Sequence, residues 1–198
     1  MNTPARTETV LLPPPDEREI LRYAGGGGTE GLPLADCLAE LGGLRGRVCF
    51  CEYDIRETPE GLDLGFAFSC SADLQKALSG CGRLLLFAAT VGFAPDRLIA
   101  RYGRVSPARA LLFQAIGSER AEALCDAFCA RKKAEYAEAG CELRPRFSPG
   151  YVDLPLSLQK EVFAALDLPR TLGITLGESL LMMPSKSVTA LAGIRKKT

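Results

Sequence analysis

The sequence contains no histidine. Imidazole is the base of Ser-His-Asp and Cys-His catalytic arrangements, and it is the commonest transition-metal ligand among side chains. Its absence removes these catalytic arrangements and the commonest transition-metal ligand from this chain. Any chemistry performed here runs without an imidazole group.

An excess of charge of either sign is also missing. The 24 Lys and Arg residues balance the 24 Asp and Glu residues, so the formal net charge is zero. A broad electrostatic grip on nucleic acid or on an anionic membrane needs clustered basic residues. The one basic cluster, at residues 195–197, is interpreted as a solvated tail. We therefore expect neither a nucleic acid nor a membrane partner.

Long apolar runs are absent as well. No segment approaches the roughly 18 consecutive apolar residues of a membrane span. The first residues, MNTPARTETVLLPPPDERE, also lack the apolar region of a secretory signal. These features favour a cytoplasmic protein whose thiols stay reduced.

The eight cysteines lack the spacing of a metal site. No CxxC occurs, and the intervals match neither a zinc ribbon nor a ferredoxin. Cys49 and Cys51 fall on one face of an expected strand, and Cys125 and Cys129 on one face of an expected helix. We interpret them as small core residues, with no metal bound. A metal-binding or thiol-redox protein is the alternative interpretation.

The pattern of elements predicts an α+β fold in which helices pack on a mostly antiparallel, twisted sheet, because strands and helices alternate without a regular βαβ period. An extended N-terminal arm (1–15) precedes a single domain (16–198). The runs at 47–55 and 62–68 are predicted to form a hairpin or two adjacent antiparallel strands. Other predicted strands are 83–92, 141–147 and 188–194; predicted helices are 16–23, 32–41, 71–79, 95–102, 106–139 and 156–166.

The stretch RPRFSPGY at 144–151 predicts a strand that ends in a stiff turn. Pro149 fixes its own φ, and Gly150 accepts the positive φ that a type II turn needs at its third position. Arg146 and Tyr151 flank this turn. A guanidinium group matches the geometry of a carboxylate, and a phenol offers an aromatic face with one hydroxyl. The alternative is an ordinary surface arginine beside a half-buried tyrosine.

The segment RFSPGYVDLPLSLQKEVFAALD, followed by LGITLGESLLMMPSKSVTALAGI, resembles the activation domain of cobalamin-dependent methionine synthase in a shortened, stand-alone form. That family carries an R-x-x-P-G-Y element, a helix, a T-E-S-like element, a proline and an S-V-S-G-like strand. The corresponding pieces occur here in the same order. They are residues 146–151, 156–166, 177–179, Pro184 and 187–190.

The resemblance implies a protein that binds S-adenosylmethionine and supports the reductive remethylation of oxidised cobalamin. Cobalamin itself would sit on a partner, either a cobalamin-dependent methionine synthase or another corrinoid protein. The electron donor would be a flavodoxin-like protein. The implied contact to the ligand carboxylate is Arg146. The other residues implied to line the site are Phe147, Ser148, Gly150 and Tyr151, with Glu178 and Ser179 as further candidates.

Two departures from the family pattern leave a second reading open. The family has further tyrosines near its C-terminal strand, whereas the last tyrosine here is Tyr151. Ala130 also stands where the family pattern suggests an acidic residue. The alternative is therefore a docking module for a corrinoid protein that has lost S-adenosylmethionine binding. In either case no catalytic residue is assigned.

Overall fold

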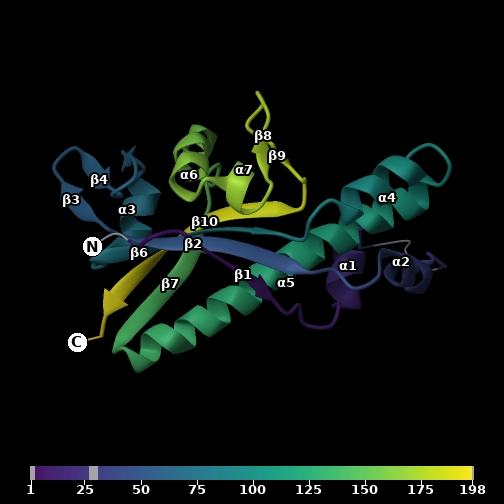
Figure 1. Cartoon of the computed structure of the whole chain (residues 1–198), viewed down its shortest axis with the longest axis horizontal. Helices are drawn as coiled ribbons and strands as arrows, with labels where there is room; N and C mark the ends of the chain where they lie inside the picture. Colours follow the sequence, from purple (N-terminus) through teal and green to yellow (C-terminus); the bar gives the residue numbers. More distant parts are fainter. Residues whose placement is uncertain (1–2, 27–30, 198) are drawn as a thin grey trace.

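The computed structural model describes residues 3–26 and 31–197. Its centre is a five-stranded sheet in the order β1-β2-β6-β10-β7, and every neighbouring pair is antiparallel (Figure 1). The predicted α+β fold with a mostly antiparallel sheet is confirmed. The strands are β1 (Arg6–Val10), β2 (Gly46–Asp54), β6 (Arg83–Thr90), β7 (Cys141–Phe147) and β10 (Ser187–Lys196).

Helices cover both faces of this sheet. In Figure 1, α5 crosses one face, while α3, α6 and α7 lie on the other. The short strands form two smaller sheets, one of β3, β4 and β5 and one of β8 and β9. The helices are α1 (Glu17–Tyr23), α2 (Leu34–Leu41), α3 (Ala72–Leu78), α4 (Ala94–Tyr102), α5 (Pro107–Glu138), α6 (Gln159–Leu166) and α7 (Leu168–Thr171), with a 3₁₀ turn at Leu156–Leu158. The short strands are β3 (Arg56–Thr58), β4 (Gly61–Asp63), β5 (Phe68–Ser69), β8 (Thr175–Leu176) and β9 (Met182–Met183).

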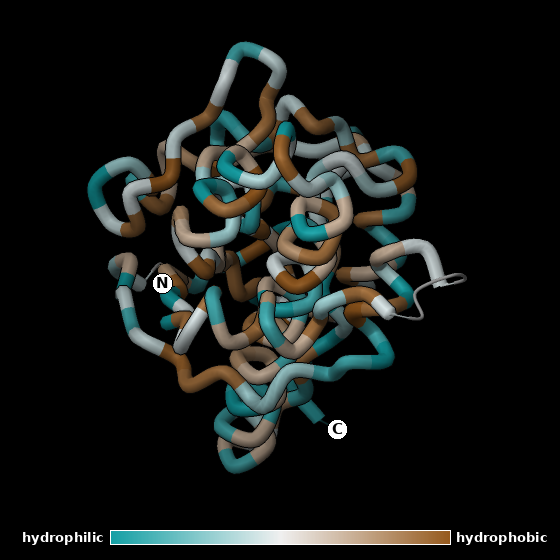
Figure 2. The backbone as a smooth tube through the Cα atoms, turned by 90° about the vertical axis from the view of Figure 1, so that its right-hand side faces the viewer, coloured by the Kyte–Doolittle hydropathy of each residue, from teal (hydrophilic) through white to brown (hydrophobic). Residues whose placement is uncertain are grey.

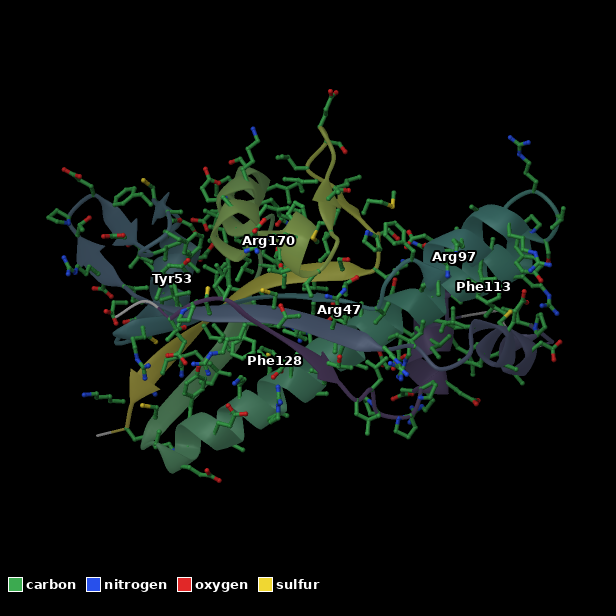
Figure 3. All side chains as sticks on the ribbon, in the orientation of Figure 1. Arg47, Tyr53, Arg97, Phe113, Phe128 and Arg170 are labelled. Carbon is green, nitrogen blue, oxygen red and sulfur yellow. The ribbon has the colours of Figure 1, made fainter. Side chains whose placement is uncertain are left out.

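The alternating side chains of β6 supply two separate cores. Leu84 and Leu86 pack with α6 and α7, whereas Leu85 and Phe87 pack with α5. This explains why the strand is apolar along nearly its whole length, as a strand buried on both faces should be. Phe128 projects from α5 toward the sheet (Figure 3), and its ring centroid lies 5.0 Å from that of Phe87. Figure 2 shows hydrophobic residues on interior segments and hydrophilic residues at many outer loops.

Helix α5 runs unbroken for 32 residues. The pair Gly117-Ser118 lies inside it without interrupting it. A Cβ atom on Gly117 would lie 2.9 Å from Cγ of Lys186 and 3.0 Å from Cβ of Pro95. Glycine is therefore needed here for close packing between α5, α4 and the chain entering β10, since no side chain would fit.

Three expectations differ from the structure. The predicted pairing of 47–55 with 62–68 is wrong, because β2 pairs with β1 and β6, whereas β4 pairs with β3 and β5. An alternating pattern shows that a segment is a strand but does not show which strand it pairs with, and the next strand in sequence is not the partner of β2. The range 1–15 contains β1, an edge strand of the main sheet, and is not simply an extended arm. Arg195 lies in β10 and pairs with Glu142, so the basic cluster is not merely a tail.

Among the described residues, none of the helices combines the length and apolar character needed to cross a bilayer.

A buried ion pair on α5 holds the proline-rich segment in place. Glu119 and Arg120 expose only 5% and 4% of their surface, and Arg120 Nη2 lies 2.5 Å from Glu119 Oε1. Arg120 also donates to the carbonyl oxygens of Pro13 and Pro14, at 2.5 and 3.1 Å. Glu119 accepts a hydrogen bond from the backbone N–H of Asp16 at 3.3 Å. The pair thus satisfies polar groups of the N-terminal segment that α5 covers.

We expect Arg120→Met to destabilise the protein by about 3–5 kcal/mol, because it leaves the Glu119 carboxylate buried without its cation. The double variant Glu119→Gln/Arg120→Met should lose less, since the uncompensated charge is gone. Urea unfolding followed by circular dichroism measures both free energies. A single variant no less stable than the double one would contradict this role for the pair.

Candidate functional site

Strand β7 ends in a tight turn. The backbone N–H of Tyr151 donates to the carbonyl oxygen of Ser148 at 3.1 Å. Gly150 has a φ of +90°, which residues with a side chain rarely adopt and which a type II turn requires at this position. The Pro-Gly pair therefore forms the turn that the sequence predicts.

A cavity of about 250 Å³ opens beside this turn. It lies where the end of β7, the start of β10, α5 and α6 come together. The strand and turn contribute Arg146, Phe147, Ser148, Pro149 and Tyr151; α5 contributes Glu122, α6 contributes Gln159, and the C-terminal strands contribute Met182, Ser187, Val188 and Thr189. Four of the residues proposed from sequence, Arg146, Phe147, Ser148 and Tyr151, thus face one cavity.

Arg146 forms ion pairs with two carboxylates of α5. Its Nη2 lies 2.5 Å from Oε2 of Glu122, and its Nη1 lies 2.8 Å from Oδ1 of Asp126. Burial tends to lower the pKa of this guanidinium, but its acidic neighbours, among them the carboxylates of Glu122 and Asp126, outweigh burial and raise the pKa above its ordinary value. Arg146 is therefore a fixed cation at the edge of the cavity. Its two terminal nitrogens are already paired with carboxylates.

Sequence reasoning missed Glu122 and Asp126. They precede Arg146 by 24 and 20 residues, and only the packing of α5 against β7 brings them to it. Their spacing of one helical turn was visible in the sequence as acids on one face of α5. No local pattern, however, linked that face to the turn.

The floor of the cavity is polar and uncharged. Gln159 and Thr189 are almost fully buried, exposing 4% and 2% of their surface. The hydroxyl of Thr189 donates to Oε1 of Gln159 at 2.8 Å, and Ser187 shares a hydrogen bond of 2.8 Å with Thr90. Gln159 also lines the cavity, so its side-chain amide is placed to meet a molecule bound there.

Aromatic and apolar side chains form the remaining wall. The ring centroids of Phe147 and Tyr151 lie 6.3 Å apart, and Met182 faces the same space. Tyr151 is 62% exposed, so its ring stands at the mouth of the cavity. The site therefore combines charged groups at one edge, neutral hydrogen-bonding groups on the floor and aromatic surface on one wall.

Three residues proposed from sequence do not line this cavity. The N–H of Gly150 is used internally, donating to Leu154 at 2.9 Å, and a Cβ atom on Gly150 would approach Leu156 Cδ1 to 3.2 Å. The glycine thus faces Leu156 and offers no open backbone to a ligand. Glu178 and Ser179 lie in the exposed turn between β8 and β9, because the short strand pair carries them away from the cavity.

Two further cavities adjoin the first, with volumes of about 490 and 680 Å³. Arg146 lines the first and second cavities, Asp126 the second and third, and Glu122 the first and third. The ion-paired cluster therefore stands where the three spaces meet. Together they exceed the smallest ligand pockets, which measure about 300 Å³.

Comparison with known proteins identifies the fold. No family model matches the chain, and no curated protein matches it. The crystal structure of the MetH reactivation domain bound to AdoHcy is similar, with a TM-score of 0.65 over 96% of this chain and 78% of that chain. This chain has the reactivation-domain fold. The sequence identity is 14%, so the likeness establishes the fold and leaves the ligand to be argued from the site.

The cysteines have the character of core residues. Among the described residues no three His, Cys, Asp or Glu side chains form a group suited to a metal ion. Burial raises the pKa of Cys51 to about 11 and that of Cys125 to about 12. Both thiols are therefore protonated and weakly nucleophilic at neutral pH. Cys70 differs because it is exposed.

At pH 8 we expect iodoacetamide to alkylate Cys70 rapidly, and Cys51 and Cys125 only after denaturation. A thiol with a raised pKa has little thiolate below that pKa, and burial also blocks the reagent. Peptide mass spectrometry at successive times identifies the modified sites, with Cys70→Ser as the control. Rapid native-state alkylation of Cys125 would favour a reactive thiol instead.

Proposed function

We propose that this chain is a reactivation subunit that binds S-adenosylmethionine and supports reductive remethylation of cobalamin in a methionine synthase partner. The observation that carries the proposal is the cavity at the R-x-x-P-G-Y turn, with its charged edge, neutral polar floor and aromatic wall. The likeness to a reactivation domain crystallised with AdoHcy supports it. AdoHcy is S-adenosylhomocysteine, the molecule left when S-adenosylmethionine gives up its methyl group.

The chemistry of the cavity suits the parts of such a ligand. Its amino-acid end carries a carboxylate and an ammonium group, which match Arg146 and the acids Glu122 and Asp126. The ribose and base offer neutral donors and acceptors, which match the side-chain amide of Gln159 and the hydroxyls of the cavity floor. The faces of Phe147 and Tyr151 suit an aromatic base. The amino-acid end, the ribose and the base thus each have a counterpart in one place.

The ion pairs of Arg146 set a condition on binding. Two of the five guanidinium N–H donors are already engaged with Glu122 and Asp126. A ligand carboxylate would use the remaining donors, and the ligand ammonium would approach the same acids. A zwitterionic end group therefore enters this cluster with its charges compensated, whereas a lone carboxylate would face two negative side chains.

This chain's residues would bind and orient the methyl donor, and a partner would carry the methyl acceptor. Cobalamin on that partner, reduced by an electron from a flavodoxin-like donor, would accept the methyl group from the sulfonium sulfur. S-Adenosylhomocysteine would then remain on this chain. The partner is a cobalamin-dependent methionine synthase or another corrinoid protein.

One observation favours a second function. The fork of Arg146 is neutralised by two carboxylates, and the N–H groups of Gly150 and Tyr151 are both used within the turn. A site closed in this way would suit a docking module that recognises a corrinoid protein and binds no S-adenosylmethionine. Direct measurement of binding distinguishes the two functions.

We expect S-adenosylmethionine to bind the purified protein, and Arg146→Ala to weaken binding by roughly ten- to a hundredfold. This corresponds to about 1.5–3 kcal/mol for a charge-assisted hydrogen bond. Arg146→Lys should recover only part of the loss, because an ammonium group cannot reproduce the planar fork. Isothermal titration calorimetry measures the affinities, since the sequence has no tryptophan to report binding by fluorescence.

The matched control is Arg170→Ala. Arg170 is an exposed arginine paired with Asp167 and does not line the cavity, so its removal should leave the affinity unchanged. Thermal unfolding of each variant shows whether it is folded. If folded Arg146→Ala binds as tightly as the parent protein, the ligand site lies elsewhere. If the parent protein does not bind S-adenosylmethionine at all, the docking function replaces the proposed one.

A further inference from the structure

The carboxylate of Asp153 joins the cavity turn to a distant helix. Asp153 comes two residues after Tyr151, yet it caps α3, whose first turn lies about 80 positions earlier in the chain. The backbone N–H groups of Ala72 and Asp73 donate to its Oδ2 at 2.7 and 3.3 Å, and the hydroxyl of Ser71 donates to its Oδ1. A carboxylate in this position satisfies N–H groups that a helix cannot satisfy itself.

Ser71 completes the cap from within its own segment. Its hydroxyl oxygen accepts a hydrogen bond from the N–H of Leu74 at 3.0 Å while the hydroxyl proton is donated to Asp153. The hydrogen bond from Ser71 lowers the pKa of the Asp153 carboxyl below its ordinary value, so the carboxylate is charged at neutral pH. Helix α3 in turn packs against β7 and β10, the two strands that border the cavity.

The residue between Tyr151 and Asp153 is held in an unfavourable conformation. Val152 has a φ of +49°, which is rare for a β-branched residue, and its side chain is 80% exposed. Packing therefore does not stabilise it. The neighbouring residues must therefore hold this conformation. Leu154 is buried, and its N–H donates to the carbonyl oxygen of Tyr151 at 2.9 Å. Asp153 is fixed by its hydrogen bonds to α3.

We propose that Asp153 is a positioning residue, which holds the segment 148–154 against α3 and so fixes Tyr151 at the mouth of the cavity. The latch consists of the Asp153 carboxylate with Ser71 and the two N–H groups of α3. Without it, the strain at Val152 favours a different path for the segment, and the cavity loses one wall. The effect on ligand affinity rests on the function proposed above, whereas the effect on the segment does not.

Hydrogen exchange read by mass spectrometry tests the latch without any ligand. In Asp153→Ala we expect backbone amides of 148–155 to exchange about three- to thirtyfold faster, the range for loss of a helix cap. Asp153→Asn should give a smaller increase, because its amide oxygen can still accept a hydrogen bond. Adding Val152→Gly to Asp153→Ala should restore part of the protection, since glycine accepts a positive φ without strain. Glu161→Ala, which removes an exposed carboxylate of α6, is the control.

Two results would overturn the proposal. One is unchanged exchange of 148–155 in folded Asp153→Ala. The other is faster exchange confined to 72–78, because Asp153 would then only cap α3. Where the parent protein binds S-adenosylmethionine, calorimetry should also show weaker binding by Asp153→Ala than by Glu161→Ala. A parent protein that does not bind this ligand would refute the proposed function and leave the exchange test decisive for the latch.

Discussion

The buried ion pair between Glu119 and Arg120 fixes the N-terminal segment on the long helix. Proline lacks an N–H group, so the segment 13–15 can be held through its backbone only by donors to its carbonyl oxygens, and Arg120 provides them. Desolvating two charges is costly, and it is tolerated here because each partner also bonds to backbone groups. With the segment fixed, β1 meets the edge of β2 on one side and α1 packs on α5 on the other. The third cavity lies between this segment and α5.

The same helix supplies the charges of the candidate site. Glu122 and Asp126 follow Glu119 on α5 and reach Arg146 across the edge of the sheet. Because the guanidinium is held in the unliganded protein, binding need not order a long flexible side chain. The binding free energy is reduced instead by competition, because a ligand carboxylate must share Arg146 with Glu122 and Asp126. Such a site discriminates by the distribution of charge on the ligand more than by its total charge.

The features that sequence reasoning recovered are those encoded locally. The apolar run of β6, the long helix α5 that begins at Pro107 and the Pro-Gly turn each follow from neighbouring residues, and the motif resemblance led to the correct fold. The misses depend on packing that a local pattern does not encode. The partner of β2, the acids paired with Arg146 and the helix capped by Asp153 are distant in sequence. Gly150 faces Leu156, which is near in sequence, but only the folded path of the segment decides that orientation. A one-dimensional pattern shows that an arginine or aspartate is present, but packing decides which group it meets.

The order of strands in the main sheet has a consequence for biosynthesis. Strand β10 lies between β6 and β7, although it follows both along the chain. While a ribosome is still translating the residues before 187, β6 and β7 each present an edge whose eventual partner does not yet exist. Unpaired edges of apolar strands are prone to pair with other chains. A nascent chain therefore cannot complete its central sheet until β10 has been translated, and in that interval the edges of β6 and β7 are open to pairing with other chains.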